Sequence, residues 1–290
     1  MPGPRRTGGL AVTGEKVRAR EPSGSGGLQY HIKCRPGDVA PTVLLPGDPE
    51  RVPYISSFWD EYREVARHRE YVTHTGRYKG VEVSATSTGI GGPAAAIAVE
   101  ELLRVGASTF IRVGTTGAIQ PFIDVGDVII VAGAVRLDGT TKQYVRAEYP
   151  AIAHFEVVEA LIEAAESVGA RYHVGVVAST DSFYTGQARP GFKGYEQSWM
   201  KDLIPDLQRA GVLSFEMEAS TILTLSSIYG ARGGAVLAVV ANRVKDELVE
   251  NAGVEAAVRT ANEAVKILHE WDEAKKAKGR RYATPGLFRA

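Results

Sequence analysis

The sequence contains very little cysteine, because Cys34 is the only one among 290 residues. A single thiol cannot form an internal disulfide or a thiolate metal site, so we expect a reducing compartment and a cytoplasmic location. Long hydrophobic runs are also missing, since no apolar stretch approaches the roughly 20 residues that span a bilayer. Residues 1–27 lack the apolar segment of a secretory signal. These absences predict no membrane partner and no export.

The chain has no net charge, because 34 Lys and Arg residues match 34 Asp and Glu residues. Residues 1–28 carry +3 and residues 272–290 carry +4, which leaves −7 on residues 29–271. A mildly acidic body lacks the basic face that nucleic-acid binding requires. We therefore expect a flexible basic N-terminal tail (1–28), a single domain (29–271) and a basic C-terminal tail (272–290). The glycine, proline and charge of both tails favour solvated, poorly ordered segments over contacts with RNA or an acidic surface.

Short apolar segments alternate with helical patterns from residue 42 onward. The predicted strands are 42–45, 71–78, 81–87, 109–113, 128–131, 173–178 and 235–241. The predicted helices are 51–58, 93–105, 155–168, 216–229 and 252–271. This alternation indicates an α/β fold with a largely parallel or mixed central sheet. Ligands of such sheets bind beyond the carboxyl ends of the strands.

Glycine, hydroxyl, amide or guanidinium groups follow these predicted strands. Glycines let backbone N–H groups approach an anion, and arginine adds a bidentate fork for phosphate. Gly47, Arg51, Arg112 and Thr115 form a candidate oxyanion cradle, in which residues 114–117 are interpreted as a glycine-rich turn after a strand. The glycines at 89–92 match neither a Walker loop nor a dinucleotide fingerprint. None of these loops offers a cluster of metal ligands, so no metal is expected.

The ordered motifs resemble the nucleoside phosphorylase family, and within it the uridine phosphorylases, from about residue 30 to about residue 270. They are PGDPERV at 46–52, HRE at 68–70, STGIGGP at 87–93, AVEEL at 98–102, RVGTTGAIQP at 112–121, VRLDG at 135–139, DSFY at 181–184, Gln187 with Arg189, EME at 216–218, and Asn242 with Arg243. The resemblance implies a phosphorylase-like three-layer α/β/α sandwich with a central mixed sheet. The implied reaction is reversible phosphorolysis of uridine to uracil and ribose 1-phosphate, with inorganic phosphate as a substrate and no cofactor.

The resemblance also assigns each part of the substrates to side chains. A homohexamer is implied, built as a trimer of dimers whose active sites are shared between subunits. Phosphate is assigned to Gly47, Arg51, Arg112 and Thr115, with Arg69 from the neighbour. Ribose is assigned to Thr115, Met217 and Glu218, with His31 from the neighbour. The base is assigned to Phe183, Gln187, Arg189 and Arg243. The catalytic residues are then Arg112, Thr115, Glu218 and Arg189.

The chemistry of these side chains suits those roles. Guanidinium groups offset the charge of phosphate, and a carboxylate accepts from ribose hydroxyls while stabilising the cationic sugar. An amide such as Gln187 accepts from N3–H of uracil, and a guanidinium such as Arg189 donates to O4 and offsets charge on the departing base. Glu216 and Glu218 also suit the first turn of a helix, where acidic residues are favoured.

Several positions depart from the family pattern. Asn242 and Arg243 stand where hexameric purine phosphorylases place an aspartate that protonates the base, which favours a pyrimidine. Glu70 and Ile90 match a monovalent-cation site of related enzymes, but Ala94 lacks its hydroxyl, which speaks against potassium binding. Phe215 replaces a frequent tyrosine, and residues 190–210 match poorly. A purine or broad-specificity phosphorylase, a hydrolytic nucleosidase and a non-enzymatic nucleoside-binding protein stay open as alternatives.

Overall fold

The structure is a computed structural model that describes residues 18–287. Within that range the strands are β1 (Thr42–Leu45), β2 (Glu61–His68), β3 (Tyr71–Tyr78), β4 (Val81–Thr86), β5 (Thr109–Ala118), β6 (Val128–Arg136), β7 (Ala151–Ile152), β8 (Tyr172–Ser179), β9 (Ser214–Glu216), β10 (Arg232–Asn242) and β11 (Glu247–Leu248). The α-helices are α1 (Arg51–Ser56), α2 (Gly92–Arg104), α3 (Thr140–Tyr144), α4 (Phe155–Val168), α5 (Met200–Arg209), α6 (Ala219–Ile228) and α7 (Val254–Ala277). Single 3₁₀ turns occupy η1 (Ser25–Gly27), η2 (Thr185–Gln187), η3 (Phe192–Gly194) and η4 (Pro285–Leu287).

All eleven of these strands belong to one mixed sheet. The strand β5 is parallel to β1 on one side and to β10 on the other. Pairing then continues from β10 through β6, β8 and β9 and returns to β5, so five strands close into a ring. The mixed sheet predicted from the sequence is confirmed, and the closed ring was not predicted.

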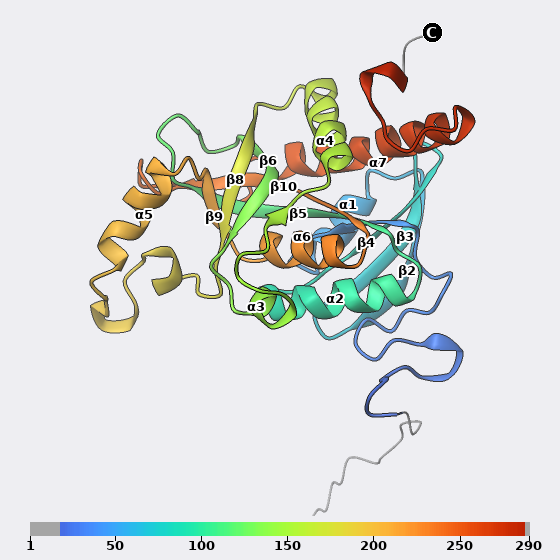
Figure 1. Cartoon of the computed structure of the whole chain (residues 1–290), viewed down its shortest axis with the longest axis horizontal. Helices are drawn as coiled ribbons and strands as arrows, with labels where there is room; N and C mark the ends of the chain where they lie inside the picture. The colour runs from blue at the N-terminus through green and yellow to red at the C-terminus, as the bar shows by residue number, and fades with distance from the viewer. Residues whose placement is uncertain (1–17, 288–290) are drawn as a thin grey trace, which may run out of the picture.

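Helices cover both faces of the sheet (Figure 1). The helices α1, α4 and α7 cover one face, where Leu44 and Ile111 point into the core. The helices α2 and α6 cover the other face, where Val43 and Phe110 point. Neighbouring residues of a strand point to opposite faces, so Arg112 lies on the face of α2 and α6, two residues after Phe110. Both helices begin near this arginine, and their N-termini favour negative charge.

The predicted hairpin is confirmed as β3 and β4, joined by Lys79 and Gly80, which both have positive φ angles as a two-residue type I′ turn requires. A further edge strand, β2, was missed. Two other predictions are wrong. Residues 114–117 are not a turn, because β10 and β9 pair with them and extend β5 to Ala118. The helix predicted to begin at Glu216 begins at Ala219, since residues 214–216 form β9.

The C-terminal segment packs on the body of the protein. The helix α7 ends at Ala277, six residues beyond the predicted end at Trp271. Beyond it, the side chains of Ala283 and Leu287 are buried in the core beneath α4 and α7. Ala283 and Leu287 therefore anchor a segment that was predicted as a solvated tail, although most of residues 276–286 are exposed. Of the predicted N-terminal tail, residues 1–17 lie outside the described residues, and residues 18–28 contain η1.

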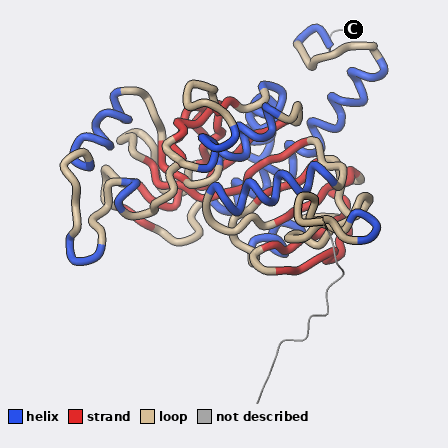
Figure 2. The backbone as a smooth tube through the Cα atoms, turned by 60° about the horizontal axis from the view of Figure 1, so that its bottom comes forward, coloured by secondary structure: helices blue, strands red, loops and turns tan. Residues whose placement is uncertain are grey.

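Two parts of the chain extend from this body (Figures 1 and 2). The segment with η3 and α5 protrudes at one end, and the C-terminal part of α7 protrudes at the other. The protruding segment includes residues 190–210, and its helix α5 was not predicted. Between residues 18 and 287, none of the helices has both the length and the apolar character to cross a membrane.

Candidate active site

A cavity of about 510 Å³ opens at the carboxyl ends of β1, β5 and β10. Nine of the predicted site residues line it, namely Gly47, Arg51, Arg112, Thr115, Phe183, Gln187, Arg189, Met217 and Glu218. They come from four separate segments of the chain, which the sheet brings to a single edge. The structure does not bring His31, Arg69 or Arg243 to the cavity wall formed by the described residues.

Arg112 is buried at the floor of this cavity between two carboxylates. Its NH2 lies 2.5 Å from Oε2 of Glu218, and its Nε lies 2.9 Å from Oε2 of Glu216. The Nε–H is not directed at a hydrogen-bond acceptor, so the contact with Glu216 is an ion pair without a well-formed hydrogen bond. The guanidinium lies along β5 over Gly114, where any Cβ would come within 2.8 Å of it. Glycine at position 114 therefore makes room for the Arg112 head group.

Glu218 caps the N-terminus of α6 and reaches across to the start of α2. Its Oε1 accepts a hydrogen bond from the backbone N–H of Gly91. Gly91 has φ 93° and ψ 161°, a conformation that essentially only glycine adopts. Burial raises the pKa of the Glu218 carboxyl above its ordinary value, while Arg112 opposes the rise and Glu216 adds to it. The carboxylate is thus held from both sides and its charge is balanced mainly by Arg112.

The predicted phosphate residues of this chain lie beside Arg112. The loops after β1 and β4 are joined by hydrogen bonds from Thr88 N to Pro46 O (2.8 Å) and from Gly89 N to Gly47 O (2.9 Å). Arg51 begins α1, and burial lowers the pKa of its guanidinium, with Asp48 opposing this and Arg112 adding to it. The two guanidinium groups disfavour each other's charged form, and a bound anion would stabilise the charge of both.

An amide and a guanidinium form the opposite end of the cavity. Arg189 NH1 donates to Gln187 Oε1 (2.6 Å), and Gln187 Nε2 donates to Thr180 Oγ1 (3.1 Å). The Arg189 guanidinium carbon lies 3.9 Å from the centre of the Phe183 ring. Burial, together with Arg243, lowers the pKa of Arg189 to about 10, so the group is cationic at neutral pH. A planar ligand that carries carbonyl and N–H groups in one ring fits this wall.

Arg243 and Asn242 contact backbone rather than the cavity. Arg243 NH1 donates to the carbonyl of Gln187 (2.8 Å), which supports the turn that carries the predicted base residues. Asn242 is fully buried; its Nδ2 donates to the carbonyls of Gln120 and Ile123, and its Oδ1 accepts from two backbone N–H groups. Asn242 therefore supplies no proton donor to a base in the cavity.

His31 and Arg69 lie together at another corner of the molecule. Glu101 holds His31 through Nδ1 (2.6 Å), and it also accepts from the backbone N–H groups of His31 and Ile32. His68, at the end of β2, lies 2.8 Å through Nδ1 from the carbonyl oxygen of His31. Arg69 follows in the β2–β3 turn with φ 55°. The two residues predicted to enter a neighbouring active site are thus adjacent in the fold.

Possible cation ligands are sparse. The side chain of Glu70 packs against Gly89, next to Ile90, and Ala94 contributes its carbonyl to the hydroxyl of Tyr71. Across residues 18–287, no group of three His, Cys, Asp or Glu side chains is placed to hold a metal ion.

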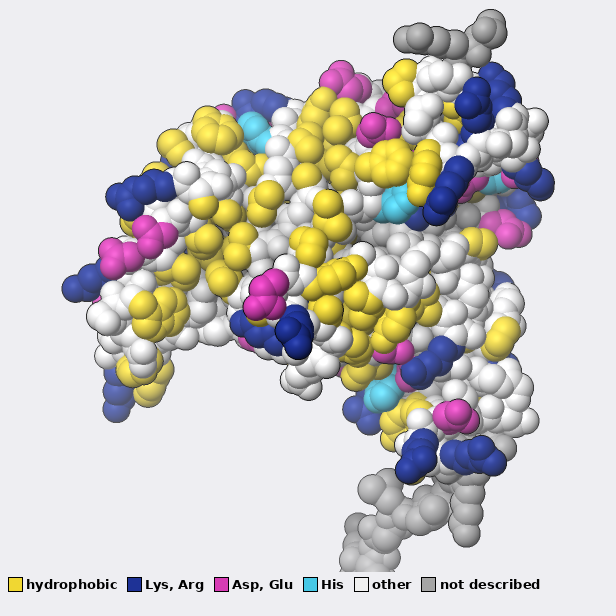
Figure 3. All heavy atoms as spheres, viewed as in Figure 1, with side chains coloured by type: hydrophobic (Ala, Val, Ile, Leu, Met, Phe, Trp, Pro, Cys, Tyr) yellow, Lys and Arg dark blue, Asp and Glu magenta, His cyan; other side chains and the backbone are white. Residues whose placement is uncertain are grey.

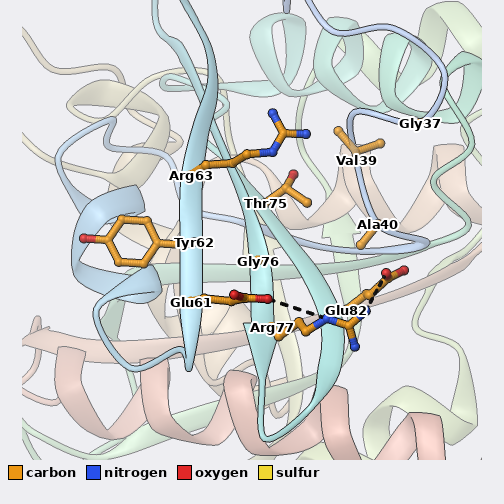
Figure 4. Close-up of a pocket in the computed structure, with 10 residues that line it drawn as sticks. All are labelled: Gly37, Val39, Ala40, Glu61, Tyr62, Arg63, Thr75, Gly76, Arg77 and Glu82. Carbon is orange, nitrogen blue, oxygen red and sulfur yellow. Dashed lines mark hydrogen bonds and ion pairs between the residues drawn. The ribbon is translucent and has the colours of Figure 1, made fainter.

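A second hollow of about 460 Å³ lies between residues 37–40 and the strands β2, β3 and β4 (Figure 4). Its charged groups largely compensate one another, since Arg77 pairs with Glu82 at 3.0 Å and with Glu61 at 3.8 Å. Figure 4 shows Tyr62 directed away from the other lining side chains. This hollow lacks the convergence of strand ends that defines the first cavity.

Some residues of the cavity were missed by sequence reasoning. Glu216 and Gly91 hold Arg112 and Glu218, and Leu248 reaches the wall from the two-residue strand β11. The spacing of Glu216 and Glu218 signals a strand face as readily as a helix turn, and no sequence pattern marks Leu248.

Comparisons with known proteins agree with this geometry. The family model of the phosphorylase superfamily matches residues 41–270. The chain belongs to the phosphorylase superfamily. It is 63% identical over 271 residues to a uridine phosphorylase of Thermococcus kodakarensis, covering 93% of this chain and 98% of that protein. It is 44% identical over 244 residues to the uridine phosphorylase of Escherichia coli, covering 83% and 95%.

Another relative is named for a different substrate. A guanosine phosphorylase of Halorubrum lacusprofundi is 39% identical over 251 residues, covering 83% of this chain and 99% of that protein. Membership of the phosphorylase superfamily confirms the resemblance drawn from the motifs, and all nine cavity residues fall within the matched range.

Proposed function

We propose that this protein catalyses the reversible phosphorolysis of uridine to uracil and ribose 1-phosphate, and is thus a pentosyltransferase. One observation carries the proposal: a single cavity joins Arg51 and Arg112 at one end to Gln187 and Arg189 at the other. The first pair suits phosphate and the second suits a pyrimidine ring. The names of the relatives from Thermococcus kodakarensis and Escherichia coli support the same reaction.

In the proposed reaction, a phosphate oxygen attacks C1′ of the ribose while the bond from C1′ to N1 of uracil breaks. Arg51, Arg112 and Thr115 hold the phosphate, and positioning of this kind supplies much of the rate. Glu218 accepts from the ribose hydroxyls and stabilises the positive charge of the sugar, above the side chain of Met217. The bonding electrons leave with the base, where Arg189 offsets the negative charge and Gln187 binds N3–H.

A purine nucleoside is the second candidate substrate, because one relative is named a guanosine phosphorylase. The engagement of Asn242 in backbone hydrogen bonds supports the pyrimidine reading, since this position offers no acid to a purine.

The test is to incubate the purified protein with uridine, thymidine, inosine or guanosine, each with and without phosphate, and to measure the free base. We expect uracil from uridine only when phosphate is present. Faster release of hypoxanthine or guanine would overturn the base assignment. Release of base without phosphate would instead indicate a nucleosidase, and binding without any product would indicate a non-enzymatic nucleoside-binding protein.

The proposal includes a homohexamer in which His31 and Arg69 complete a neighbour's site. Two observations support it. Neither residue lines the cavity of its own chain, and β7, β8 and α4 carry exposed hydrophobic side chains, namely Ile152, Val174, Val176 and Phe155. Figure 3 shows hydrophobic side chains gathered over this side of the molecule, and such surfaces mark contacts between proteins.

Mixed subunits test this sharing. Arg69→Ala and Arg112→Ala chains are each expected to be inactive. If Arg69 acts in the neighbouring site, subunits exchanged between the two variants form one intact site per mixed pair, and activity returns. Continued inactivity after exchange, confirmed by native mass spectrometry, would contradict the sharing.

The remaining parts of the proposal concern context. We place the protein in the cytoplasm, with the catalytic domain at residues 29–271, no cofactor and no bound monovalent cation. Burial raises the pKa of the Cys34 thiol to about 11 and leaves it uncharged, so this side chain is not a reactive thiol.

A further inference from the structure

We propose that Glu216 is a positioning residue of the active site, which fixes the guanidinium of Arg112 and the backbone segment that carries Glu218. This inference rests on the proposed phosphorolysis and adds a residue to which no substrate contact is assigned. The Glu216 side chain is fully buried, and it lies at the point where β9 ends and α6 begins.

Donors from two segments fix the Glu216 carboxylate. Its Oε1 accepts from the hydroxyl of Ser179, at the end of β8. Its Oε2 accepts from the backbone N–H groups of Glu218 and Ala219, each at 2.8 Å. The orientation of the Glu216 carboxylate is therefore set by the end of β8 and the start of α6.

The network continues behind Ser179. The Ser179 hydroxyl accepts from the backbone N–H of Ser220 (2.8 Å), and the Ser220 hydroxyl donates to Asp138 Oδ2 (2.7 Å). Asp138 in turn accepts from the backbone N–H and hydroxyl of Thr141 in α3. These hydrogen bonds tie β8, α6 and α3 together, so the Glu216 carboxylate is supported by three elements of the fold.

The fixed carboxylate then restrains Arg112. Its Oε2 lies 2.9 Å from Arg112 Nε, while the NH2 of the same guanidinium faces Glu218 at 2.5 Å. The head group lies against the backbone of Gly114, and that position offers no side chain to hold it. Without Glu216, a single carboxylate would hold Arg112, and that carboxylate is the one assigned to the ribose. Glu216 therefore gives Arg112, which is assigned to phosphate, a second carboxylate partner besides Glu218.

The charges of the site also point to this role. Arg51 and Arg112 are opposed by Glu216 and Glu218, so these four buried or half-buried groups sum to zero in the absence of phosphate. Loss of the Glu216 charge leaves one positive charge in excess, which favours phosphate binding. A substitution of Glu216 that lowers kcat without raising the KM for phosphate would thus indicate positioning rather than direct contact with phosphate.

Two substitutions separate the charge of Glu216 from its reach. Glu216→Gln keeps the length of the side chain, and its amide can still accept from the N–H groups of α6 and donate to Ser179. Glu216→Asp keeps the charge but shortens the side chain by one methylene. Glu159→Gln, at an exposed position of α4, is the matched control. Steady-state rates are measured with uridine and phosphate varied separately, across a range of pH, and unfolding is followed by calorimetry.

We expect Glu216→Gln to lower kcat about 100-fold, the size of effect that misplaced catalytic groups produce, while the KM for phosphate does not rise. The acid limb of kcat/KM should move to lower pH, because the charge of Glu216 raises the pKa of Glu218. Glu216→Asp should lower kcat without moving that limb, and Glu159→Gln should change neither.

The outcomes distinguish this inference from the proposed function. A wild-type protein that does not cleave uridine with phosphate defeats the proposed function. If the wild type is active, the positioning role is overturned when both Glu216 variants keep the wild-type kcat and the wild-type acid limb of the pH profile. This holds whatever their unfolding temperature. If Glu216→Gln does not fold, an unchanged kcat in Glu216→Asp overturns the role in the same way.

Discussion

The guanidinium of Arg112 lies 2.5 Å from the carboxylate of Glu218, so the residue assigned to phosphate and the residue assigned to ribose are paired with each other. Both side chains are buried, at 5% and 4% exposure. A buried ion pair contributes little net stability, but removal of one partner leaves the other as an uncompensated charge. The two residues therefore behave as one unit in both stability and chemistry.

A double-mutant cycle tests this coupling. Arg112→Ala alone should destabilise the fold by about 3–5 kcal/mol, because Glu218 is left buried and unpaired. Adding Glu218→Gln removes the stranded charge, so the double variant should be more stable than Arg112→Ala. Both single variants should lose most phosphorolysis, and their losses should not add. Chemical denaturation and kcat/KM measure the two effects, and simple additivity in both would contradict the coupling.

The pH dependence of activity should report the Glu218 carboxyl. Burial raises its pKa, and the role assigned to it requires the charged form. Activity should therefore fall as the pH drops through this raised pKa, at a pH above the ordinary range of a glutamate. The remaining activity of Glu218→Gln should lack this acid limb. A wild-type profile that is flat down to the ordinary glutamate range would show that the charged form is not needed.

Replacement of Arg189 should affect the base far more than phosphate. Arg189→Ala removes a cation that contacts Gln187 Oε1 and the Phe183 ring. We expect kcat/KM for uridine to fall by the equivalent of about 1.5–3 kcal/mol, the range for a hydrogen bond to a charged group, and the KM for phosphate to change little. Arg243→Ala is the comparison, since Arg243 acts through the backbone of Gln187. Equal losses for uridine and phosphate in Arg189→Ala would contradict its assignment.

The sequence predicted the sheet, most of the helices and the strand ends that meet at the cavity. It did so because β1, the first half of β5 (109–113) and β10 are rich in apolar residues, which a sheet covered on both faces requires. The error at residues 114–117 has a physical cause. Glycine and threonine there signal a turn, but pairing with β10 and β9 extends β5 through them. Long-range pairing of this kind overrides a local preference.

The site was predicted as a set of residues but not as a network. Motifs named Arg112 and Glu218 separately, and only the fold shows that Gly91 and Glu216 hold them. The family resemblance assigned Arg243 to the base, yet its guanidinium turns toward the carbonyl of Gln187. Such orientations depend on contacts between segments far apart in the chain, which spacing does not encode.

Gly91 should be essential for activity because of its backbone shape. Its φ of 93° excludes a side chain, and its N–H holds Glu218. Gly91→Ala should lower kcat strongly and cost about 1–3 kcal/mol of stability from backbone strain. Gly80→Ala is the matched control, since Gly80 has φ 81°, no atom within 4 Å of an added Cβ, and a place in the β3–β4 turn outside the cavity lining. It should lose stability but keep kcat, and an equal loss of kcat in both would refute the role of Gly91.

The C-terminal segment should stabilise the fold through Glu156 of α4. This carboxylate is buried and accepts from Lys275 Nζ at 2.8 Å and from the backbone N–H of Ala283 at 2.7 Å. Despite burial, these partners lower the pKa of Glu156. Lys275→Ala should cost about 1.5–3 kcal/mol at neutral pH, the range for a hydrogen bond to a charged group. Lys276→Ala, exposed one residue later, should cost little.

The sign of the pH effect follows from the lowered pKa. A carboxyl whose pKa is lower in the folded state contributes stability above its unfolded pKa and loses it as the pH falls through the folded value. The difference in unfolding free energy between wild type and Lys275→Ala should therefore shrink in acid, once Glu156 is protonated. Denaturant unfolding at neutral and acidic pH measures this difference. A gap that stays constant between the two conditions would show that Lys275 stabilises the fold by packing its methylene chain and not by pairing with Glu156.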